Sequence, residues 1–402
     1  MARHPRDNAC KLPVGVTIEA KQFLPNALIL SGGGARAAYQ VGVLTAVGEL
    51  LPQSHDNPFS IICGTSAGAI NAMSLATHAG TYHEAVDNLA SLWSELNTEN
   101  VFYTSARTLT ASGLRLVGSL FNQGMARGKS LALLDNQPLR EFLSTHIDPS
   151  GLDWQLEHGY LDALSITAMS YGSGESVNFF QARGDIDDWR RYRRVGERTE
   201  LGIEHLMASA AIPGIFPATR LGDDYYADGA VRQVTPISPA LHLGADRVMI
   251  IGVSGNRNPV HWGARRESQT HPPSIAQVFG QLFNSAFIDG LEGDIERLQR
   301  INSLLSTIPE EVRDDEGIAL REVETLVISP TEEIDMIARE HVRDMPRTVR
   351  FFFGLVGANA KAGGSATASY VLFEKPFIDR LIEMGYKDAM WDREKILDFF
   401  GA

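Results

Sequence analysis

The stretch that decides the fold is Phe59-Ser60-Ile61-Ile62-Cys63-Gly64-Thr65-Ser66-Ala67-Gly68, which an alanine-rich run from Ala69 to Ala76 follows. The apolar residues predict a buried strand and the alanine-rich run predicts a helix, so the G-x-S-x-G motif between them forms a tight turn with Ser66 at its apex. Its glycines are needed because a side chain would collide where the turn packs on its neighbours. The helix directs free N–H groups at an anion that forms on the serine, which indicates a serine nucleophile.

A second strand–loop–helix unit precedes this turn. Ala27-Leu28-Ile29-Leu30 predicts a short buried strand, and Ser31-Gly32-Gly33-Gly34-Ala35-Arg36 follows it directly. Apolar residues then recur at helical spacing, at Tyr39, Val43, Val47 and Leu50. Glycines let backbone N–H groups approach a ligand closely, so this loop can hold a phosphate or an oxyanion.

The phosphate interpretations fail on detail. A dinucleotide fingerprint needs a third glycine where Ala37 stands, and no acidic residue ends a clear second strand about 20 residues on. A P-loop needs a lysine after the glycines, and none follows them. Gly128-Lys129-Ser130 has Gly124 one residue too close and no strand before it, so we interpret it as a solvated loop.

A third motif, Tyr225-Tyr226-Ala227-Asp228-Gly229-Ala230, predicts a strand that ends in a turn. It follows the small-residue, proline-containing stretch Ala208–Pro217, which is more typical of a pocket wall than of an amphipathic helix.

The three motifs in this order resemble the patatin-like phospholipase family over about residues 25 to 255. The resemblance implies an α/β fold of three layers, α/β/α, with a mostly parallel central sheet. It also implies a Ser–Asp dyad without histidine, acting on acyl esters of lipids. By position, Ser66 is the nucleophile and Asp228 the base, and the oxyanion N–H groups come from Gly32, Gly33 and Gly34.

The same resemblance assigns supporting positions to Arg36, Gly64, Ala67, Gly68 and Gly229. The chain departs from the family pattern at three positions, none of which carries a reacting group: Ala37, Ala230 and Val234.

The main competing hypothesis is an α/β-hydrolase whose triad would be Ser66, Asp228 and His242. In that fold several strands precede the nucleophile, whereas the residues before Phe59 hold one credible strand. His242 lies on a predicted helix, where packing is its commoner role. A binding protein without turnover, and acyl transfer to an acceptor other than water, remain open.

A carboxylate base limits how the proton of Ser66 can be removed, because an ordinary carboxylate is a weak base. An ordinary Asp has a pKa of about 3.9, and each unit of mismatch with its task costs about 1.4 kcal/mol. We therefore expect proton transfer to accompany attack, burial to raise the pKa of Asp228, and the oxyanion hole to supply most of the stabilisation.

Charge and hydrophobicity limit the classes of partner that the protein can bind and where it can act. The net charge of -13 argues against nucleic acid and against general attraction to anionic membranes. The basic run Arg190–Arg194 is interpreted as a solvated face rather than a headgroup site. No apolar run reaches the length of a membrane span and no cleavable signal peptide is evident, so we expect a cytoplasmic or membrane-peripheral protein, with export by another route left open.

The two cysteines, Cys10 and Cys63, are too few for a disulfide framework, and Cys63 is interpreted as a buried small residue. We predict no metal and no cofactor. The expected partner is a lipid or another acyl ester at a membrane or micelle surface.

The predicted organisation has three parts: an irregular lead-in (1–25), a catalytic domain (26–330) and a C-terminal helical extension packed on the core (331–402). Further expected strands are Leu164–Met169, Arg247–Val253 and Glu324–Ser329, and expected helices are Ile275–Leu305 and Tyr370–Met384.

Two further segments carry hypotheses. Thr104–Gly128 is interpreted as a lid over the site. The aromatic run Arg350–Val356 is assigned to core packing in preference to a lipid-docking surface or the lining of an acyl pocket.

Overall fold

The computed structural model describes residues 25–52, 57–121, 132–233, 235–254, 272, 275–309, 312, 320–355 and 365–402. Several expectations lie outside these residues: the lead-in up to residue 24, Cys10, the tripeptide at 128–130, the end of the predicted lid and Val234.

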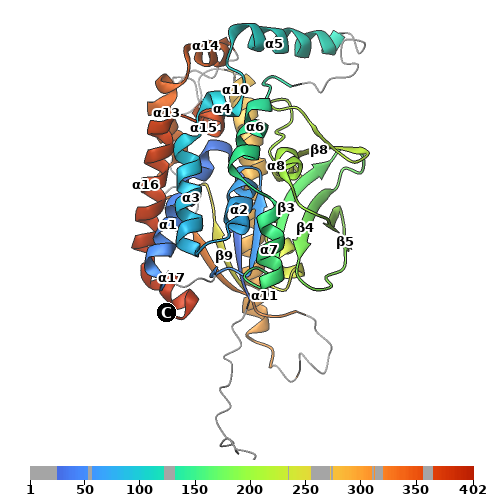
Figure 1. The fold of residues 1–402 in the computed structure, drawn as a ribbon, viewed down its shortest axis with the longest axis vertical. Helices are drawn as coiled ribbons and strands as arrows, with labels where there is room; N and C mark the ends of the chain where they lie inside the picture. Colours follow the sequence, from blue (N-terminus) through green and yellow to red (C-terminus); the bar gives the residue numbers. More distant parts are fainter. Residues whose placement is uncertain are drawn as a thin grey trace, which may run out of the picture.

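The chain builds one ten-stranded sheet with helices on both faces (Figure 1). Five neighbouring strands are parallel, in the order β10-β9-β1-β2-β3. They are short apolar runs, as expected for strands buried on both faces, and their bounds are β1 (Asn26–Leu30), β2 (Ile61–Thr65), β3 (Ala163–Ser170), β9 (Arg247–Ile251) and β10 (Glu324–Ile328). The predicted α/β class with a mostly parallel central sheet is therefore confirmed.

An antiparallel extension continues the sheet beyond β3. β4 pairs antiparallel with β3, β6 follows parallel to β4, and β5 closes the edge, while β8 and β7 form a ribbon on β3. The bounds are β4 (Ser176–Ala182), β5 (Trp189–Arg191), β6 (Arg194–Arg198), β7 (Thr219–Leu221) and β8 (Asp224–Asp228). The basic run lies in β5, the turn and β6, and is exposed up to Arg193.

Alternate residues of the parallel strands bury two separate cores, one on each face of the sheet. Leu28 and Ile62 belong to the larger core, whereas Ile29 and Cys63 belong to the smaller one. The larger core is covered mainly by α1 (Ala38–Leu50), α2 (Ala67–Thr77), α3 (Tyr82–Glu95), α6 (Gln137–His146), α7 (Ser150–His158), α8 (Ile203–Ser209), α13 (Ile334–His341), α15 (Ser365–Val371), α16 (Lys375–Trp391) and α17 (Arg393–Phe400). The smaller core is covered by α9 (Ser238–His242) and α11 (Gly290–Leu305). Burial raises the pKa of the Cys63 thiol to about 12, which is consistent with an inert core residue.

Two predicted helices differ in detail. The single helix expected over Tyr370–Met384 is wrong, because α15 ends at Val371 and α16 begins at Lys375. Pro376 explains the break, since it lacks an N–H and is tolerated only in the first turn of a helix. The helix expected over Ile275–Leu305 comprises α10 (Ile275–Asn284), five π-helical residues in η6 (Ser285–Asp289), and α11.

The C-terminal segment shares the larger core with the rest of the chain. α16 lies against α1 (Figure 1), and the two helices approach through glycines. A Cβ atom added at Gly42 would lie 1.9 Å from the carbonyl oxygen of Ile382, and one at Gly385 would lie 2.1 Å from that of Tyr39. The Tyr39 hydroxyl donates to Asp388 at 3.0 Å across this contact. α16 of the predicted extension thus packs against α1, and the division at residue 330 stays a prediction.

Gly42→Ala should destabilise the protein by about 1–3 kcal/mol, because the added methyl group forces α1 and α16 apart. Gly293→Ala in α11 is the matched control, since a Cβ atom there meets nothing within 4 Å and helix propensity should raise stability by about 0.5–1 kcal/mol. Urea unfolding measures both free energies. Equal stability of the two variants would contradict the close crossing.

Candidate functional site

Ser66 and Asp228 meet because two strands share one edge of β3. β2 occupies this edge up to Thr65, which pairs with Thr167. β8 approaches from the opposite direction and ends with Asp228, which pairs with Ala168, the next residue of β3. The residue that follows β2 and the last residue of β8 are therefore adjacent, although 161 positions separate them in the sequence.

The turn at Ser66 holds a strained backbone. Ser66 has φ 56° and ψ -127°, and Arg193 is the only other described non-glycine residue with positive φ. Such geometry needs support from its surroundings and is concentrated at functional sites. A Cβ atom at Gly64 would lie 2.5 Å from the Cα atom of Ala69, and one at Gly68 would lie 2.2 Å from the Leu30 carbonyl oxygen. Both glycines are therefore required sterically.

Ser209 supports the turn from below. The Ser66 N–H donates to the Ser209 hydroxyl at 2.8 Å, and that hydroxyl donates to the Thr167 carbonyl at 2.6 Å. Both bonds are buried, so Ser209 ties the turn to β3. Ser209 falls in the stretch predicted to be a pocket wall, but a lone serine carries no motif that would predict this role.

A chain of polar side chains continues beneath the turn. Gln233 accepts from the Thr65 hydroxyl at 2.8 Å and donates to the Thr167 hydroxyl at 3.0 Å, which in turn donates to Asn178 at 2.9 Å. Gln233 therefore joins the end of β2 to β3 and to the segment just after Asp228. Gln233 and Asn178 were not predicted from the sequence, because their spacing follows no local pattern.

The Asp228 carboxyl is fully buried. Burial raises its pKa to about 7, because desolvation disfavours the charged form, and hydrogen bonding with the Ser66 side chain and the Ala230 backbone only partly opposes this rise. Oδ1 accepts from the Ala230 N–H at 3.0 Å, whereas Oδ2 makes no well-aligned hydrogen bond within the described structure. Gly229 permits this turn, since a Cβ atom there would lie 2.3 Å from the Thr167 carbonyl oxygen.

The glycine loop borders the same space. A Cβ atom on Gly32 would lie 3.1 Å from the Cβ atom of Ser66, so the loop backbone lies against the serine. Gly34 has φ 56° and lines the cavity next to Ser66. The N–H groups of Gly32, Gly33 and Gly34 donate to no described residue, and they remain available to a ligand.

A buried hydrogen-bonded chain fixes the base of this loop. Gln40 donates to the Ser31 carbonyl at 2.8 Å and accepts from Asn71 at 2.9 Å, and Asn71 in turn accepts from the Trp93 indole at 2.7 Å. These side chains come from α1, α2 and α3, so the three helices hold the loop in one position. Gln40 and Asn71 were not identified from the sequence.

Arg36 is directed toward the C-terminal helices. Its Nη2 contacts Asp335 Oδ1 at 2.5 Å, its Nε donates to the Ser369 hydroxyl at 2.8 Å, and its guanidinium lies 4.0 Å from the centroid of the Tyr370 ring. Asp335 belongs to α13, and Ser369 and Tyr370 belong to α15. The buried guanidinium thus joins the glycine loop to residues 331–402.

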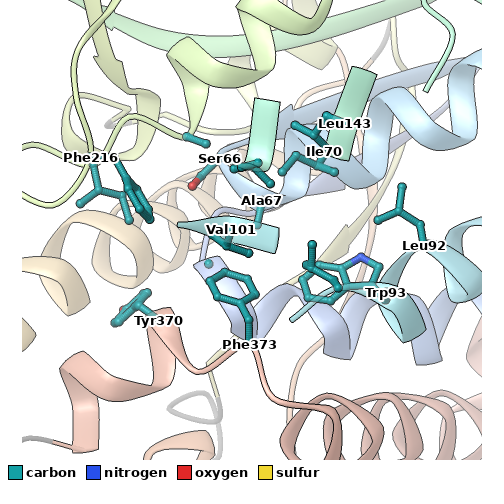
Figure 2. A pocket seen from close by; sticks show the side chains of 15 residues that line it. Ser66, Ala67, Ile70, Leu92, Trp93, Val101, Leu143, Phe216, Tyr370 and Phe373 are labelled. Carbon is teal, nitrogen blue, oxygen red and sulfur yellow. The ribbon is translucent and has the colours of Figure 1, made fainter. Parts of the chain in front are cut away.

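An apolar cavity of about 30 Å³ adjoins Ser66 (Figure 2). Figure 2 shows the Ser66 hydroxyl directed toward Phe216 and Tyr370, with Phe373 and Trp93 on the far side of the cavity. The lining side chains come from α2, α3, α4 (Thr98–Val101), α6 and α15 and from the segment after α8. This volume holds one or two waters, so a long acyl chain requires the lining side chains to move.

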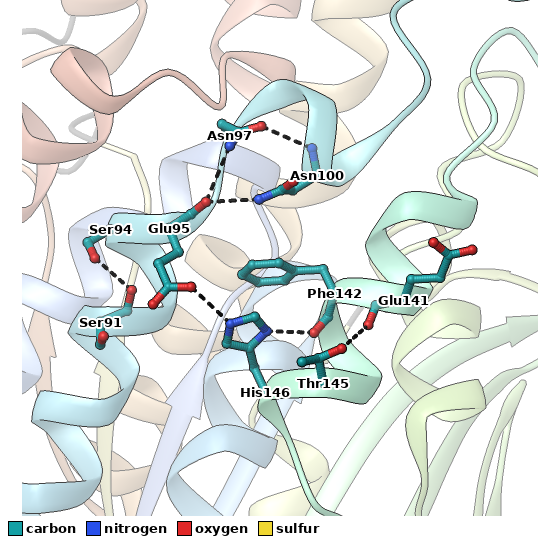
Figure 3. A network of polar contacts seen from close by, with 9 residues as sticks. All are labelled: Ser91, Ser94, Glu95, Asn97, Asn100, Glu141, Phe142, Thr145 and His146. Atoms are coloured by element: carbon teal, nitrogen blue, oxygen red, sulfur yellow. Dashed lines mark hydrogen bonds and ion pairs between the residues drawn. The ribbon is translucent and has the colours of Figure 1, made fainter.

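A polar network holds the wall of this cavity (Figure 3). Glu95, at the end of α3, contacts His146 of α6 at 3.1 Å, and its backbone carbonyl accepts from Asn97 and Asn100. Asn97 also caps α4. The network fixes α4 between α3 and α6, where Val101 of α4 reaches the cavity.

His242 lies near the amino ends of the parallel strands, whereas Ser66 lies at their carboxyl ends. It ends α9, which leads into β9, and β9 begins at Arg247, opposite Asn26 at the start of β1. Ser66 follows the carboxyl end of β2, which is parallel to β1. The His242 ring stacks on Trp189 and bonds to the Ser238 carbonyl. This position separates His242 from Asp228 and removes the basis for the competing triad.

Within the described residues no group of three or more His, Cys, Asp or Glu side chains could hold a metal ion. No described helix combines the length and the apolarity needed to cross a bilayer.

With this geometry established, comparison with known proteins assigns the family. The family model for patatin-like phospholipases matches residues 28–241, which contain the glycine loop, the Ser66 turn and Asp228. The chain belongs to the patatin-like phospholipase family. The resemblance seen in the three motifs is thereby confirmed.

Two curated phospholipases are distant relatives of this family member. It is 27% identical over 215 residues to a cGAMP-activated phospholipase of Pseudomonas aeruginosa, covering 54% of this chain and 55% of the relative. It is 23% identical over 222 residues to the rabbit (Oryctolagus cuniculus) calcium-independent phospholipase A2-gamma, covering 54% of this chain and 25% of the relative. The match thus spans about half or less of each relative's length.

Solved structures show weaker similarity. Human GIVD cytosolic phospholipase A2, in complex with methyl gamma-linolenyl fluorophosphonate, aligns with a TM-score of 0.41 at 13% identity, covering 94% of this chain and 59% of that one. VipD from Legionella pneumophila aligns with a TM-score of 0.30 at 12% identity, covering 92% and 67%.

Asp228→Asn should stabilise the protein at pH 8 and leave its stability nearly unchanged at pH 4. The pKa of Asp228 is higher in the folded than in the unfolded protein, so stability from this group is present below about pH 4 and is lost as the pH rises through about 7. Since each pH unit in this interval corresponds to about 1.4 kcal/mol, the ionised carboxylate costs on the order of 4 kcal/mol at pH 8.

Urea unfolding at the two pH values measures the difference. Asp223→Asn, at a fully exposed carboxylate, is the control and should change stability by less than about 0.5 kcal/mol. A stability gain for Asp228→Asn that is the same at pH 4 and pH 8 would contradict the raised pKa.

Proposed function

We propose that this protein is a serine lipid acyl hydrolase that cleaves acyl ester bonds of phospholipids or lysophospholipids with a Ser66–Asp228 dyad. The observation that carries the proposal is the meeting of Ser66 and Asp228 on one edge of β3, beside glycine N–H groups that donate to no described residue. Membership of the phospholipase family and the two phospholipase relatives support the reaction class.

In the first half-reaction Ser66 Oγ attacks the ester carbonyl carbon while its proton moves to the Asp228 carboxylate. A pKa of about 7 makes this carboxylate a far better proton acceptor than an ordinary aspartate. The carbonyl oxygen becomes an oxyanion, which the N–H groups of Gly32, Gly33 and Gly34 stabilise together with the N-terminus of α2. The C–O bond then breaks, Asp228 returns the proton to the leaving alcohol, and acyl-Ser66 remains.

In the second half-reaction Asp228 takes a proton from water as the water attacks the acyl carbonyl. The same N–H groups stabilise the second oxyanion, and the fatty acid leaves as the proton returns to Ser66. Gly64, Gly68 and Ser209 act by position, because they keep the serine in its strained conformation. Arg36 likewise acts by position, through the C-terminal helices.

Covalent labelling by a fluorophosphonate tests the nucleophile. We expect the probe to label Ser66 in the native chain, and Ser66→Ala to lose both labelling and about 10⁴-fold or more of ester hydrolysis. Asp228→Asn should lose hydrolysis to a similar extent, because the base is gone while the fold is kept.

His242→Ala is the matched control and should retain hydrolysis within about twofold, since His242 packs on Trp189 at the far edge of the sheet. Loss of activity in this variant, or activity retained by Asp228→Asn, would refute the dyad. Failure of the native chain both to react with the probe and to release fatty acid would favour a binding protein on this fold.

The pH dependence of kcat/KM tests the role of Asp228 as a base. With a soluble short-chain ester, kcat/KM should rise about tenfold per pH unit below pH 6.5 and level off above about pH 7, as the carboxyl ionises. A profile that is flat from pH 5 to pH 8 would contradict a base with a pKa near 7.

A further inference from the structure

Two segments far apart in the sequence are cationic and free of acidic residues. Residues 101–134 contain Arg107, Arg115, Arg127 and Lys129 and no Asp or Glu, and residues 345–373 contain Arg347, Arg350 and Lys361 and no Asp or Glu. Four of these cations lie in the described helices of the two segments, Arg107, Arg115, Arg347 and Arg350, in a chain whose net charge is -13. Such a concentration of one sign creates a local potential opposite to that of the whole protein.

The helices of these segments lie together at one end of the molecule. α5 (Ala106–Phe121) lies across the top of Figure 1 beside α14 (Arg347–Leu355). A groove of about 450 Å³ runs between them, lined by Leu109 and Leu114 of α5 and by Arg347 and Phe351 of α14. Val349 is buried and anchors α14 on the core, so the groove faces outward from a fixed base.

The outer surface of the two helices combines bulky apolar and cationic side chains. Leu114 is 68% exposed and Phe351 is 71% exposed, so the core packing predicted for the aromatic run Arg350–Val356 is wrong for Phe351. Arg107, Arg115, Arg347 and Arg350 form no ion pair with a described carboxylate, which leaves their charges uncompensated within the described structure. These six residues are called the α5–α14 cap below.

We propose that the α5–α14 cap binds the surface of anionic phospholipid bilayers. Exposed Leu and Phe among arginines are typical of a helix that lies in the membrane interface, with its apolar groups in the acyl boundary and its cations at the phosphates. A protein that is acidic elsewhere is repelled by such a surface, so the cap also sets the orientation of docking.

The cap lies next to the proposed site. α4 and α15, which supply Val101 and Tyr370 to the cavity at Ser66, lie directly below α5 and α14 in Figure 1. Docking at the cap therefore brings a lipid layer to the end of the molecule that holds the cavity at Ser66. This part of the inference rests on the proposed function, whereas the binding itself does not.

Vesicle flotation of the full-length Ser66→Ala chain tests the cap without turnover. We expect binding to vesicles of phosphatidylcholine with about 30 mol% phosphatidylglycerol, weak binding to pure phosphatidylcholine, and release by high salt. Since each cation near the surface contributes about a fivefold factor, Arg107→Gln combined with Arg347→Gln should lower the partition coefficient about 25-fold.

Arg300→Gln combined with Arg393→Gln is the matched control. It removes two exposed cations from α11 and α17, which lie toward the other end of the molecule in Figure 1, and should leave binding unchanged. A second variant, Leu114→Ser with Phe351→Ser, should weaken binding to the anionic vesicles at low salt although all the cap cations are kept.

Three outcomes would overturn the proposal: equal binding to neutral and anionic vesicles, equal loss in the cap and control variants, or a dimer in light scattering that the cap variant abolishes without any vesicle binding.

Hydrolysis of a soluble short-chain ester separates the two proposals. Arg107→Gln combined with Arg347→Gln, in a chain that keeps the native Ser66, should retain this hydrolysis if the dyad is correct, whatever the result of the vesicle experiment. Intact vesicle binding without such hydrolysis would refute the dyad alone.

Discussion

The site depends on a change of strand partner along β3. The first half of one edge of this strand is occupied by β2, and the end of the same edge is occupied by β8, which runs in the opposite direction. Ser66, which follows the parallel strand β2, and Asp228, the last residue of the antiparallel strand β8, therefore lie next to each other. The polar side chains that tie the strand ends together, Ser209 and Gln233 among them, bond to β3 at Thr167. β3 is therefore the element from which both Ser66 and Asp228 are positioned.

The same arrangement opposes stability. Ser66 keeps a positive φ, and Asp228 keeps a buried carboxyl whose Oδ2 is not satisfied by any well-aligned bond within the described structure. Strain and unsatisfied polar groups of this kind persist only where the surroundings over-determine them. Here the surroundings include sterically required glycines and a fully buried chain of Gln40 and Asn71. The packing of α1, α2 and α16 around the sheet offsets this unfavourable free energy.

The C-terminal segment belongs to the architecture of the site. Arg36 leaves the glycine loop and reaches Asp335 and Ser369, while Tyr370 contributes to the cavity wall and stacks on the same guanidinium. A change in α13 or α15 is therefore transmitted directly to the glycine loop. The narrow cavity and the cationic cap lie at the same end of the molecule, so the elements that would have to move for an acyl chain to enter are close to those that would meet a lipid surface.

The sequence by itself determined the two strand–turn–helix units, the family and the mostly parallel sheet, because these follow from local apolar runs and from glycines that the backbone requires. It also identified Ser66 and Asp228 as candidates through their flanking motifs. It did not determine the polar support of Ser209, Gln233, Gln40 and Asn71 or the direction of the Arg36 side chain. The sequence also contains the two acid-free basic segments, whereas the meeting of their helices α5 and α14 at one end of the molecule exists only in the folded chain. The physical reason is common to these features: each depends on contacts between residues tens to hundreds of positions apart, which leave no periodicity or spacing in the chain.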